Sequence, residues 1–559
     1  MAVASILKTL FAYRHRGAVF MSATVENETL VDVLAAIVGK DHVLTDPAER
    51  DYYSRDLSYL PFERAEAVVQ PALTDELARV VRACTDAGYA VVPRGGGMSY
   101  TLGYTPERTR SVVIDMLRMD RIVEINADNM YVIVECGCTW KKLVEALAEK
   151  GVRTPYYGPL SGMYATVGGA ISQNSLFLGS GDHHTVAESV LGLEVVLASG
   201  ELLRTGSWAH KNSLPFYRHF GPDVTGLFTA DNGAFGLKAR AVLRLVPLPE
   251  TTLTMSFAFD TLEQMLEAQI EQSRLRLCAE CYGFDPYYNK TFEDRGFSFK
   301  QGVNTLGRVV RSGNSWLTGL ADAFKLAVSG RRSLDKVNYS LHMTFEGPTR
   351  DIAASKLRLA RQMCVNHDGV EINNSLPTAF NAAPFEGVGS VILGSDGEIW
   401  LPVHGFMPLS KVQTVGRAVE EFFERNRERM ERHDIRTSYL TCNSGTEFVI
   451  EPSFYWYDEV QQYRLDRIEP QFRKKWEGRE AEPDKRREAL KLREELRDLM
   501  DAHGCCHLQI ARYYPYQEMM NNQPLWDSLC RFKRQFDPRG LVNPGVLGLD
   551  GEQSRDSRS

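Results

Sequence analysis

The stretch YAVVPRGGGMS at residues 89–99 decides the fold. Its apolar part, Tyr89–Pro93, predicts a buried strand that runs directly into three consecutive glycines, Gly95–Gly97. Glycine adopts positive φ without steric cost and lets main-chain N–H groups approach a ligand closely, which suits a pyrophosphate. A tight turn between strand and loop explains the same residues. The stretch lacks the Gly-Lys-Ser/Thr of a Walker A loop and the spacing of a nicotinamide-binding fingerprint, so neither of those sites is predicted.

Two more glycine-rich segments follow along the chain. The second runs through Pro159–Gly162 and Ala165–Ala170, and the third is Asp231–Gly236. Each could be an ordinary loop when taken alone. Three such loops, each next to a strand or a helix, would let main-chain amides converge on one large phosphorylated ligand. We therefore expect the three loops to share a binding site.

The region around these loops alternates short strands with amphipathic helices. The predicted strands are 89–93, 112–115, 121–125, 131–135, 191–198, 201–205 and 239–246, and the predicted helices lie between Thr74, an N-cap, and Gly88, and between Thr139 and Lys150. Ser199-Gly200 is a two-residue hairpin signal. This pattern is typical of an α+β fold.

A second domain is predicted to begin after about Pro247, where the helices lengthen. Apolar segments at 339–345, 399–406 and 447–451 indicate strands of another sheet. Residues 461–501 form a long charged helical stretch that breaks near Pro470 and Pro483.

The composition is that of a water-soluble globular protein. The chain has 559 residues, of which 43% are hydrophobic and 25% charged. Lys and Arg total 65 against 72 for Asp and Glu, so the formal charge of −7 disfavours a nucleic-acid partner. No apolar run approaches the roughly 20 residues that span a bilayer. We expect a cytoplasmic protein, with a periplasmic location left open.

The ten cysteines are irregularly spaced and do not form a disulfide scaffold, which favours a reducing compartment. Cys278 and Cys281 have the spacing of half a zinc site, but no second CxxC or His pair accompanies them. We therefore expect both on an amphipathic helix, and no metal site is predicted.

The order of these segments resembles the flavin domain of the vanillyl-alcohol oxidase and 4-cresol dehydrogenase family. The similar segments are PRGGGMS (93–99), ATVGGAISQNSLFLGSGDHH (165–184), GLFTADNGAFGLKA (226–239), HGFMPLSKV (404–412) and FDPRGLVNPG (536–545), and the resemblance covers most of residues 45–548. It implies a two-subdomain, PCMH-type FAD-binding domain followed by an α+β cap domain that covers the flavin ring and forms the substrate site. It also implies oxidation by hydride transfer to flavin N5.

The resemblance and the change near Pro247 together divide the chain into five parts. These are an N-terminal arm and helix (1–44), the FAD-binding domain (45–247), the cap or substrate domain (248–505), a C-terminal return to the FAD domain (506–548) and a disordered tail (549–559).

The resemblance also assigns cofactor contacts residue by residue. The first loop would hold the FAD pyrophosphate, the second would run along the pyrophosphate and the isoalloxazine, and the third would contact the adenine side. Asn543 would lie near the ring. The residues so assigned are Pro93, Arg94, Gly95, Gly96, Gly97, Met98, Ser99, Pro159, Leu160, Ser161, Thr166, Val167, Gly168, Gly169, Gly233, Phe235, Gly236, His404, Arg512 and Asn543.

In this family a His or Tyr of the cap segment that matches residues 401–408 can tether the flavin covalently. His404 is the candidate here, since Met98 stands where related flavoproteins carry a histidine in the first loop. Two alternatives stay open, namely an untethered His404 that faces the substrate and a strand-end histidine bonded to a main-chain carbonyl.

Phenol-oxidising members of the family hold a phenolate with two tyrosines and an arginine, because an ionised ring oxygen eases hydride loss from the benzylic carbon. The counterparts assigned here are Tyr100, Tyr514 and Arg512, with Arg512 also able to serve the flavin N1/O2 edge and His404 as tether or base. Their spacing departs from the family pattern, because no Tyr-Arg pair lies near residues 504–509.

The predicted function is FAD-dependent oxidation of a para-substituted phenol, or of a phenylpropanoid-type aromatic alcohol or alkylphenol. O2 or an electron-accepting protein would take the electrons onward, and a homo-oligomer such as a dimer is expected. One alternative is a D-2-hydroxy-acid dehydrogenase, whose metal ligands include two histidines seven apart, where this chain has His404 and Lys411. The other is a catalytically decayed flavin-binding or scaffold protein.

Overall fold

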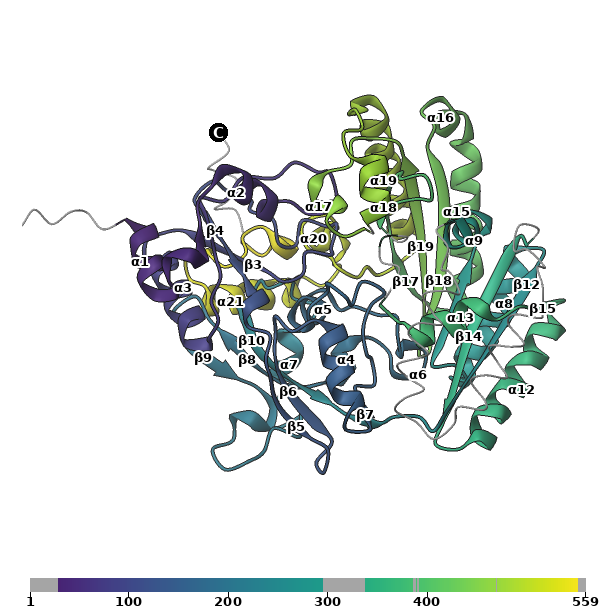
Figure 1. Cartoon of the computed structure of the whole chain (residues 1–559), viewed down its shortest axis with the longest axis horizontal. Coiled ribbons are helices and arrows are strands. Elements are labelled where there is room, and N and C mark those ends of the chain that lie inside the picture. The colour runs from purple at the N-terminus through teal and green to yellow at the C-terminus, as the bar shows by residue number, and fades with distance from the viewer. Residues whose placement is uncertain (1–28, 295–336, 386–388, 390–391, 469, 551–559) are drawn as a thin grey trace, which may run out of the picture.

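The computed structural model describes residues 29–294, 337–385, 389, 392–468 and 470–550. Most of the expected N-terminal arm and of the expected tail lies outside these residues. Figure 1 shows two bodies side by side, one built from the purple and blue segments and one from the green segments. The yellow C-terminal segment lies against the first body.

The first sheet contains the strand that leads into the glycine loop. Its order is β1 (Val43–Leu44), β2 (Ala67–Val69), β4 (Ser111–Asp115) and β3 (Ala90–Arg94). Strands β2, β4 and β3 are parallel, and parallel strands are buried on both faces, which explains their valine-rich runs. The helices packed against this sheet are α1 (Leu30–Val38), α2 (Pro47–Ser54) and α3 (Thr74–Asp86).

The second sheet is antiparallel throughout and carries the third glycine loop. Its order is β5 (Ile122–Asn126), β6 (Tyr131–Glu135), β10 (Leu237–Arg244), β8 (Val190–Val196) and β9 (Leu202–Arg204). Strands β8 and β9 form the predicted hairpin, in which Gly200 has a φ of +79°. The neighbouring elements are α4 (Trp140–Ala148), α5 (Val167–Gln173) and a small sheet of β7 (Val152–Arg153) and β11 (Val246–Pro247).

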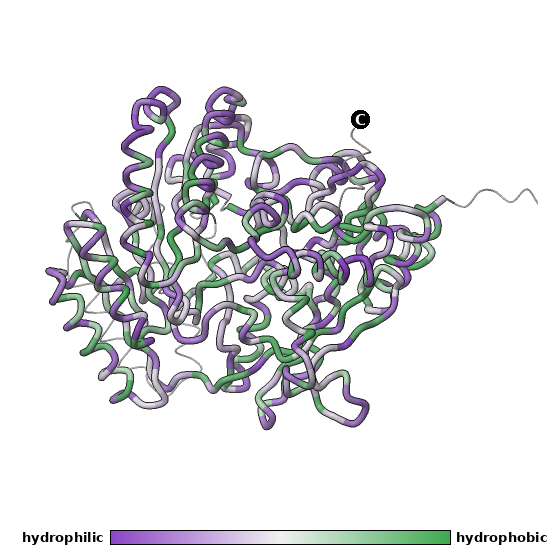
Figure 2. Tube along the Cα trace, turned by 180° about the vertical axis from the view of Figure 1, so that it is seen from behind, coloured by the Kyte–Doolittle hydropathy of each residue, from purple (hydrophilic) through white to green (hydrophobic). Residues whose placement is uncertain are grey.

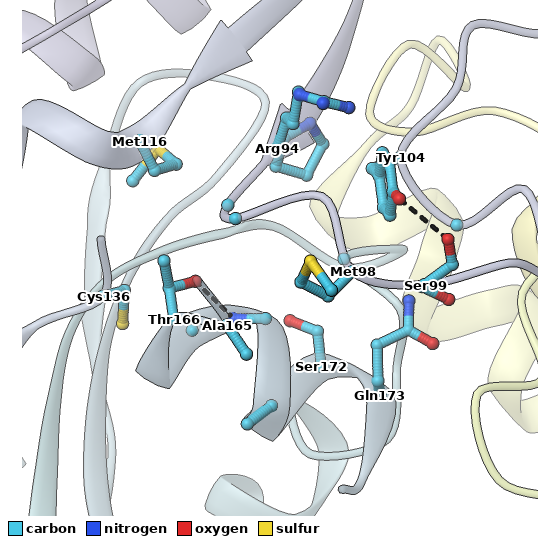
Figure 3. A pocket seen from close by; sticks show the side chains of 18 of the residues that line it. Arg94, Met98, Ser99, Tyr104, Met116, Cys136, Ala165, Thr166, Ser172 and Gln173 are labelled. Atoms are coloured by element: carbon cyan, nitrogen blue, oxygen red, sulfur yellow. Dashed lines mark hydrogen bonds between the residues drawn. The ribbon is translucent and has the colours of Figure 1, made fainter. Parts of the chain in front are cut away.

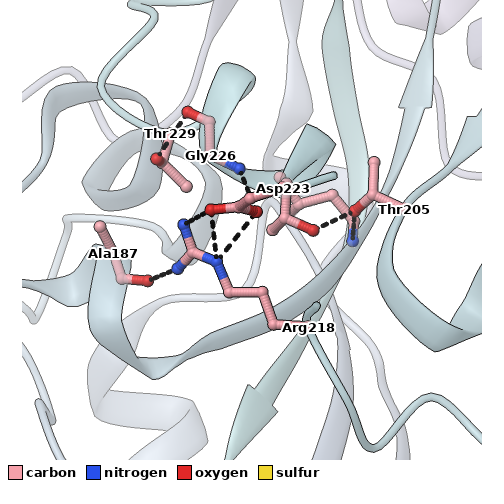
Figure 4. Close-up of polar contacts among 8 residues, drawn as sticks. Ala187, Thr205, Arg218, Asp223, Gly226 and Thr229 are labelled. Atoms are coloured by element: carbon pink, nitrogen blue, oxygen red, sulfur yellow. Dashed lines mark hydrogen bonds and ion pairs between the residues drawn. The ribbon is translucent and has the colours of Figure 1, made fainter. Parts of the chain in front are cut away.

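The segment between β9 and α7 (Val224–Leu227) is fixed by one arginine (Figure 4). Arg218 Nη2 lies 2.9 Å from Asp223 Oδ2, and its Nη1 donates to the carbonyl of Ala187 at 2.5 Å. Asp223 in turn caps α7 by accepting from the N–H of Gly226 at 2.9 Å. The ion pair therefore joins the loop to the start of the helix that follows it.

An eight-stranded antiparallel sheet forms the centre of the second body. Its order is β15 (Val370–Ile372), β12 (Thr251–Phe259), β14 (Tyr339–Gly347), β13 (Glu280–Phe284), β18 (Arg436–Ser444), β19 (Glu447–Trp456) and β16 (Ile399–Pro402), and β17 (Gly405–Pro408) also pairs with β19.

Each face of this sheet has a different neighbour. One face is covered by α8 (Leu262–Leu275), α12 (Arg350–Asn366), α15 (Val412–Arg425) and α19 (Pro483–Ala502). The other face meets the first body through α6 (Ser180–His183), with α9 (Pro286–Asp294) and α13 (Ser375–Ala382) beside it. The remaining helices are α16 (Arg427–Arg432), α17 (Gln462–Leu465), α18 (Pro470–Trp476), α20 (Tyr516–Met519) and α21 (Gln523–Phe536). Figure 2 shows hydrophilic residues gathered at the outer ends of the helices, whereas the outer helices carry both hydrophilic and hydrophobic residues along their length.

The C-terminal segment connects the two bodies. Cys506 exchanges main-chain hydrogen bonds with Phe406 of β17, at 2.7 and 2.8 Å. Further on, Val542 pairs in parallel with Val91 of β3. The segment therefore joins the strand that precedes the glycine loop to the large sheet of the second body.

Two local predictions are wrong. Thr74 is the first residue of α3, and Leu73 stands at the N-cap without a side-chain hydrogen bond. Cys278 follows α8 and Cys281 lies in β13, so the two cysteines do not share a helix. The apolar segment around these two cysteines is short, and a short apolar run does not distinguish a helix from a buried strand.

The predicted strand 399–406 is also wrong in its continuity, because it consists of β16 and β17. The ladder with β19 is interrupted between Pro402 and Gly405. Proline has no N–H to donate, and Pro402 and Pro452 both lie at this point of the ladder. The interruption places His404 outside regular pairing.

Candidate functional site

A cavity lies where the three glycine-rich loops meet. Figure 3 shows Thr166, Ser172 and Gln173 on and near α5, facing the loop that carries Met98. The residues assigned from sequence that line the cavity are Pro93, Arg94, Gly95, Gly96, Gly97, Met98, Ser99, Pro159, Ser161, Thr166, Gly168, Gly169, Gly233 and Gly236. The three loops therefore share one site.

Each glycine of the first loop is required by a different steric constraint. A Cβ at Gly95 would collide with Thr166 Oγ1, and one at Gly96 would collide with the carbonyl of Tyr164. Both glycines therefore let the first loop pack tightly against the second. Gly97 has a φ of +67°, in the region that favours glycine. The same glycines therefore form the tight turn and leave room for a ligand beside the main chain.

The main-chain N–H groups of the first loop are available to a ligand. Among the residues that the structure describes, none accepts a hydrogen bond from the N–H of Gly95, Gly96, Gly97 or Met98. Main-chain donors enclosed by protein are almost always paired in native structures. Successive free N–H groups that line a cavity are typical of an anion site.

The second loop contributes differently, although it lies at the start of α5. The N–H groups of Val167 and Gly168 donate to the carbonyls of Cys138 and Cys136, each at 2.9 Å. The N–H of Gly169 donates to Thr166 Oγ1 at 3.3 Å. Because these first amides of α5 already have partners, the second loop shapes the cavity and the free donors come from the first loop.

The third loop is held by a buried ion pair. Lys238 Nζ lies 2.5 Å from Asp231 Oδ1, and both side chains are almost fully enclosed. Asp231 Oδ1 also accepts from the N–H of Gly233 at 3.0 Å. A buried pair of this kind fixes geometry more than it adds stability, because desolvating both charges offsets their attraction. It therefore sets the position of Gly233 at the cavity.

Three residues assigned to the cofactor lie outside the lining. Val167 and Phe235 belong to the apolar core, where Phe235 packs against Phe228 and Phe536. Leu160 packs against the same core. Their neighbours in each loop face the cavity, because successive residues of a loop point in different directions. The loop sequence alone does not show which of them faces inward.

Arg512 and Asn543 also lie outside the lining, and each holds cavity loops in place. Arg512 Nε donates to the carbonyl of Leu102 at 3.1 Å, and its Nη2 donates to that of Thr105 at 2.8 Å. Asn543 Nδ2 donates to the carbonyls of Gly103 at 2.9 Å and Asn232 at 2.7 Å. Both side chains thus hold segments that line the cavity, and their expected positions beside the flavin ring stay predictions.

A second group of polar side chains lies next to the cavity, where the two bodies meet. Gln509 lines the cavity, accepts from Ser99 Oγ at 2.9 Å and donates to Tyr100 Oη at 3.5 Å. Beyond this contact lies the group that we call the polar cluster. Its members are Tyr100, His404, Arg493, His507 and Tyr514, and all are buried.

His404 is held by its neighbours in the cluster and does not line the cavity. Its N–H donates to Tyr514 Oη at 3.2 Å, and its Nδ1 lies 3.3 Å from the same oxygen. Its carbonyl accepts from His507 Nδ1 at 2.7 Å. Burial lowers the pKa of His404 to about 3, so the ring is neutral. Its Nε2 is buried without a partner among the described residues.

Arg493 brings an uncompensated positive charge into the cluster. Its Nε donates to the carbonyl of Pro402 at 2.9 Å, and its Nη2 donates to that of Tyr100 at 3.2 Å. Its Nη1 is buried and has no partner among the described residues. Among the described residues, ion pairs are formed by its helix neighbours Arg487 and Arg497 but not by Arg493. A buried cation of this kind favours an anionic ligand.

Glu451 of β19 carries a carboxyl group that interacts electrostatically with Tyr100 and Tyr514. Burial is the main cause that raises the pKa values of Tyr100 and Tyr514; the ionised form of Glu451 raises them further, and the charge of Arg493 lowers them. Glu451 and Arg493 therefore act electrostatically on the same two tyrosines. Burial raises the pKa of Glu451 to about 8.

Sequence reasoning missed several residues that the structure places here. The unassigned lining residues are Gly103, Tyr104, Met116, Cys136, Ala165, Ala170, Ser172, Gln173, Ser175, Asn232, Leu237, Lys238 and Gln509. Arg493 was missed as well, although it left a signal. It interrupts an apolar helical stripe that includes Ala489, Leu492 and Leu496, and a charged side chain is seldom fully buried unless it is paired.

The described residues also bear on metal ligands, cysteines and membrane-spanning helices. Among the described residues, no three His, Cys, Asp or Glu side chains gather in a way that could hold a metal ion. All ten cysteines are free. Within the same residues, no helix has the length and apolar character needed to cross a membrane.

Comparison with known proteins by sequence points to flavoproteins. Residues 65–206 match the family model of the FAD binding domain. The glycolate oxidase subunit GlcD of Bacillus subtilis is 31% identical over 230 residues, which are 41% of this chain and 47% of that protein. A mitochondrial D-lactate dehydrogenase (cytochrome) of Arabidopsis thaliana is 28% identical over 246 residues, 43% of this chain and 41% of that protein. The chain thus spans about half the length of the curated relatives it matches.

Comparison by structure extends over nearly the whole chain. p-Cresol methylhydroxylase with bound substrate has a TM-score of 0.69 at 15% identity, covering 93% of this chain and 96% of that one. The 4-ethylphenol oxidase of Gulosibacter chungangensis has a TM-score of 0.66 at 19% identity, covering 94% and 98%. Residues 65–206 are therefore an FAD binding domain, within a chain that has the α+β fold of p-cresol methylhydroxylase.

Proposed function

We propose that the chain is an FAD-dependent oxidoreductase that oxidises an aromatic hydroxy compound, either a para-substituted phenol or an aromatic alcohol. The free N–H groups of Gly95–Met98 fit the pyrophosphate, and the other loops enclose the rest of the cofactor. Bound FAD would supply the two-electron acceptor for a hydride from the substrate.

The polar cluster supports the aromatic part of this proposal. It combines the rings of Tyr100 and Tyr514 with the guanidinium of Arg493 and two imidazoles whose pKa values are lowered by burial, and Trp400 packs beside Tyr100. Aromatic walls suit a flat ring, and the free Nη1 of Arg493 suits an ionised ring oxygen. The observation that carries the proposal is this buried, unpaired guanidinium beside the cofactor cavity. We therefore assign to Arg493 the charge-stabilising role first given to Arg512.

Glu451 is the candidate proton acceptor. An alcohol that becomes a carbonyl loses its hydroxyl proton, and a base with a pKa near the working pH takes it most effectively. With a pKa raised to about 8, Glu451 meets that condition. Tyr100 and Tyr514 lie within its electrostatic reach and are the hydroxyl partners in this assignment.

A second candidate function is oxidation of a D-2-hydroxy acid. The sequence relatives named glycolate oxidase and D-lactate dehydrogenase favour it. A substrate carboxylate would also pair with the free Nη1 of Arg493. In that case Arg493 would hold the substrate carboxylate, which is negatively charged both before and after hydride transfer.

Anaerobic stopped-flow reduction of the bound flavin separates the two candidates. The panel consists of 4-alkylphenols, 4-hydroxybenzyl alcohols, glycolate and D-lactate. Reduction by the phenols or benzyl alcohols supports the first candidate, whereas reduction by the hydroxy acids alone transfers the proposal to the second. Oxygen consumption with the active substrate then tests whether O2 or a protein takes the electrons, and light scattering tests for the expected dimer.

A further inference from the structure

We infer that Tyr463 and Arg467 of the second body aim the N–H donors of the glycine loop at the cofactor pyrophosphate. This inference rests on the proposed cofactor site and adds to it that the site is completed by contact between the two bodies. Neither residue lines the cavity, so both would act through the loop as positioning residues.

Tyr463 fixes one peptide of the loop. Its hydroxyl donates to the carbonyl of Gly97 and accepts from Arg94 Nη2 at 2.7 Å. A tyrosine hydroxyl carries a single hydrogen, so the donation from Arg94 leaves that hydrogen for Gly97. Tyr463 is 1% exposed, so water does not compete for this carbonyl. Tyr463, together with Arg94 at the end of β3, thus orients the peptide between Gly97 and Met98.

Arg467 fixes the preceding peptide. Its Nη2 donates to the carbonyl of Gly96 at 3.3 Å. Its Nη1 donates to the carbonyl of Tyr463 at 2.6 Å, and its guanidinium lies 3.8 Å from the centre of the Tyr463 ring. The two side chains therefore form one rigid unit that contacts two successive carbonyls of the loop.

The planarity of the peptide bond converts these contacts into a direction for the donors. The described chain contains no cis peptide bond, so each C=O and the N–H that follows it point in opposite directions. The carbonyls of Gly96 and Gly97 point to the second body. The N–H groups of Gly97 and Met98 therefore point away from it, and both residues line the cavity.

The contact with Tyr463 matters because this loop consists of glycines. Glycine peptides rotate more freely than others, so a loop of three glycines has little preference of its own for one peptide direction. Without Tyr463 the peptide between Gly97 and Met98 would sample both directions. Binding the pyrophosphate would then require ordering the loop, which weakens affinity.

The test compares two Tyr→Phe variants, Tyr463→Phe and Tyr59→Phe. Tyr59 is a matched control, because its hydroxyl also crosses between the bodies, to the carbonyl of Glu459 at 2.7 Å, but does not contact the glycine loop. Apoprotein of each variant is titrated with FAD, and the two pyrophosphate resonances of bound FAD are recorded by phosphorus NMR. We expect Tyr463→Phe to weaken FAD binding by about 10-fold, in keeping with the loss of a buried hydrogen bond, and to shift those resonances.

The control should keep its FAD affinity within about 2-fold and its phosphorus spectrum unchanged. Equal losses in both variants would overturn the inference, because they would show a general weakening of the contact between the bodies. Unchanged affinity and spectrum in Tyr463→Phe would overturn it as well. If circular dichroism shows that Tyr463→Phe does not fold, Arg467→Met takes its place with the same expected direction. Wild-type apoprotein that fails to bind FAD would instead contradict the proposed function.

Discussion

Arg493 stacks on the ring of Tyr513, with its Cζ 3.7 Å from the ring centre. The stacking and two hydrogen bonds to carbonyls hold the guanidinium so that Nη1 keeps no partner within the described residues. A cation fixed in this way costs no reorganisation when negative charge develops beside it. The proposed binding of substrate by Arg493 depends on this fixed position.

Arg493→Met should slow flavin reduction by about 100-fold at saturating substrate, because it removes a pre-positioned charge partner. Stopped-flow absorbance measures the rate. Arg497→Met is the matched control, since Arg497 also lies over the Tyr513 ring, at 5.1 Å, but pairs with Asp498. Equal rates in the two variants would remove Arg493 from the site.

Flavin reduction should become faster as the pH rises through about 8. Burial raises the pKa of Glu451 to that value, and only its ionised form accepts a proton. Glu451→Gln should be slow at every pH and lack this inflection. The measurement is the limiting rate of flavin reduction between pH 6 and pH 10. An inflection that persists in Glu451→Gln would assign it to another group.

Glu451 should also affect stability, in a direction that the linkage relation fixes. Between its usual pKa of 4.5 and about 8, the folded protein holds a proton that the unfolded chain has lost. Stability therefore falls as the pH rises across this window and is level above it. Urea unfolding at several pH values should show a shallower decline in Glu451→Gln. An identical decline in both proteins would contradict the raised pKa.

Acid precipitation should release the flavin into the supernatant. His404 Nε2 is enclosed, its Nδ1 contacts Tyr514 Oη, and the residue does not line the cavity, so we expect no covalent tether. The absorbance of pellet and supernatant measures the outcome. Yellow colour that stays with the denatured protein would restore the tether as a hypothesis.

The parts of the site that follow from sequence are those encoded locally. The strand and glycine stretch at residues 89–99 predicts a turn with exposed amides because its conformation depends on neighbouring residues. Arg493 and Tyr463 reach the same region from more than 350 residues away in the chain, through hydrogen bonds to Tyr100 and Gly97. No spacing rule connects residues so far apart.

The contacts of Arg512 could not be predicted from sequence for a related reason. A cation close to several tyrosines in sequence resembles a charge clamp, but Arg512 donates to main-chain carbonyls of the loop 102–105. Which way a loop arginine points depends on packing that the sequence does not display. The interruption between β16 and β17 is different, because Pro402 and Pro452 could have predicted it.

Asn543→Ala should weaken FAD binding by about 10-fold and lower stability by about 1–3 kcal/mol, since it leaves two buried carbonyls without a donor. Those carbonyls belong to Gly103 and Asn232, which both line the cavity. Flavin fluorescence titration and urea unfolding provide the two measurements. A variant that loses stability but binds FAD normally would show that Asn543 has no positioning role.

The central claim is that the glycine loop binds FAD through its main-chain N–H groups. Hydrogen–deuterium exchange of the peptide that covers residues 94–99, with and without FAD, tests it most directly. We predict that these amides exchange rapidly in the apoprotein and slowly with FAD, because each N–H gains an acceptor. Bound FAD that leaves their exchange unchanged would contradict the account.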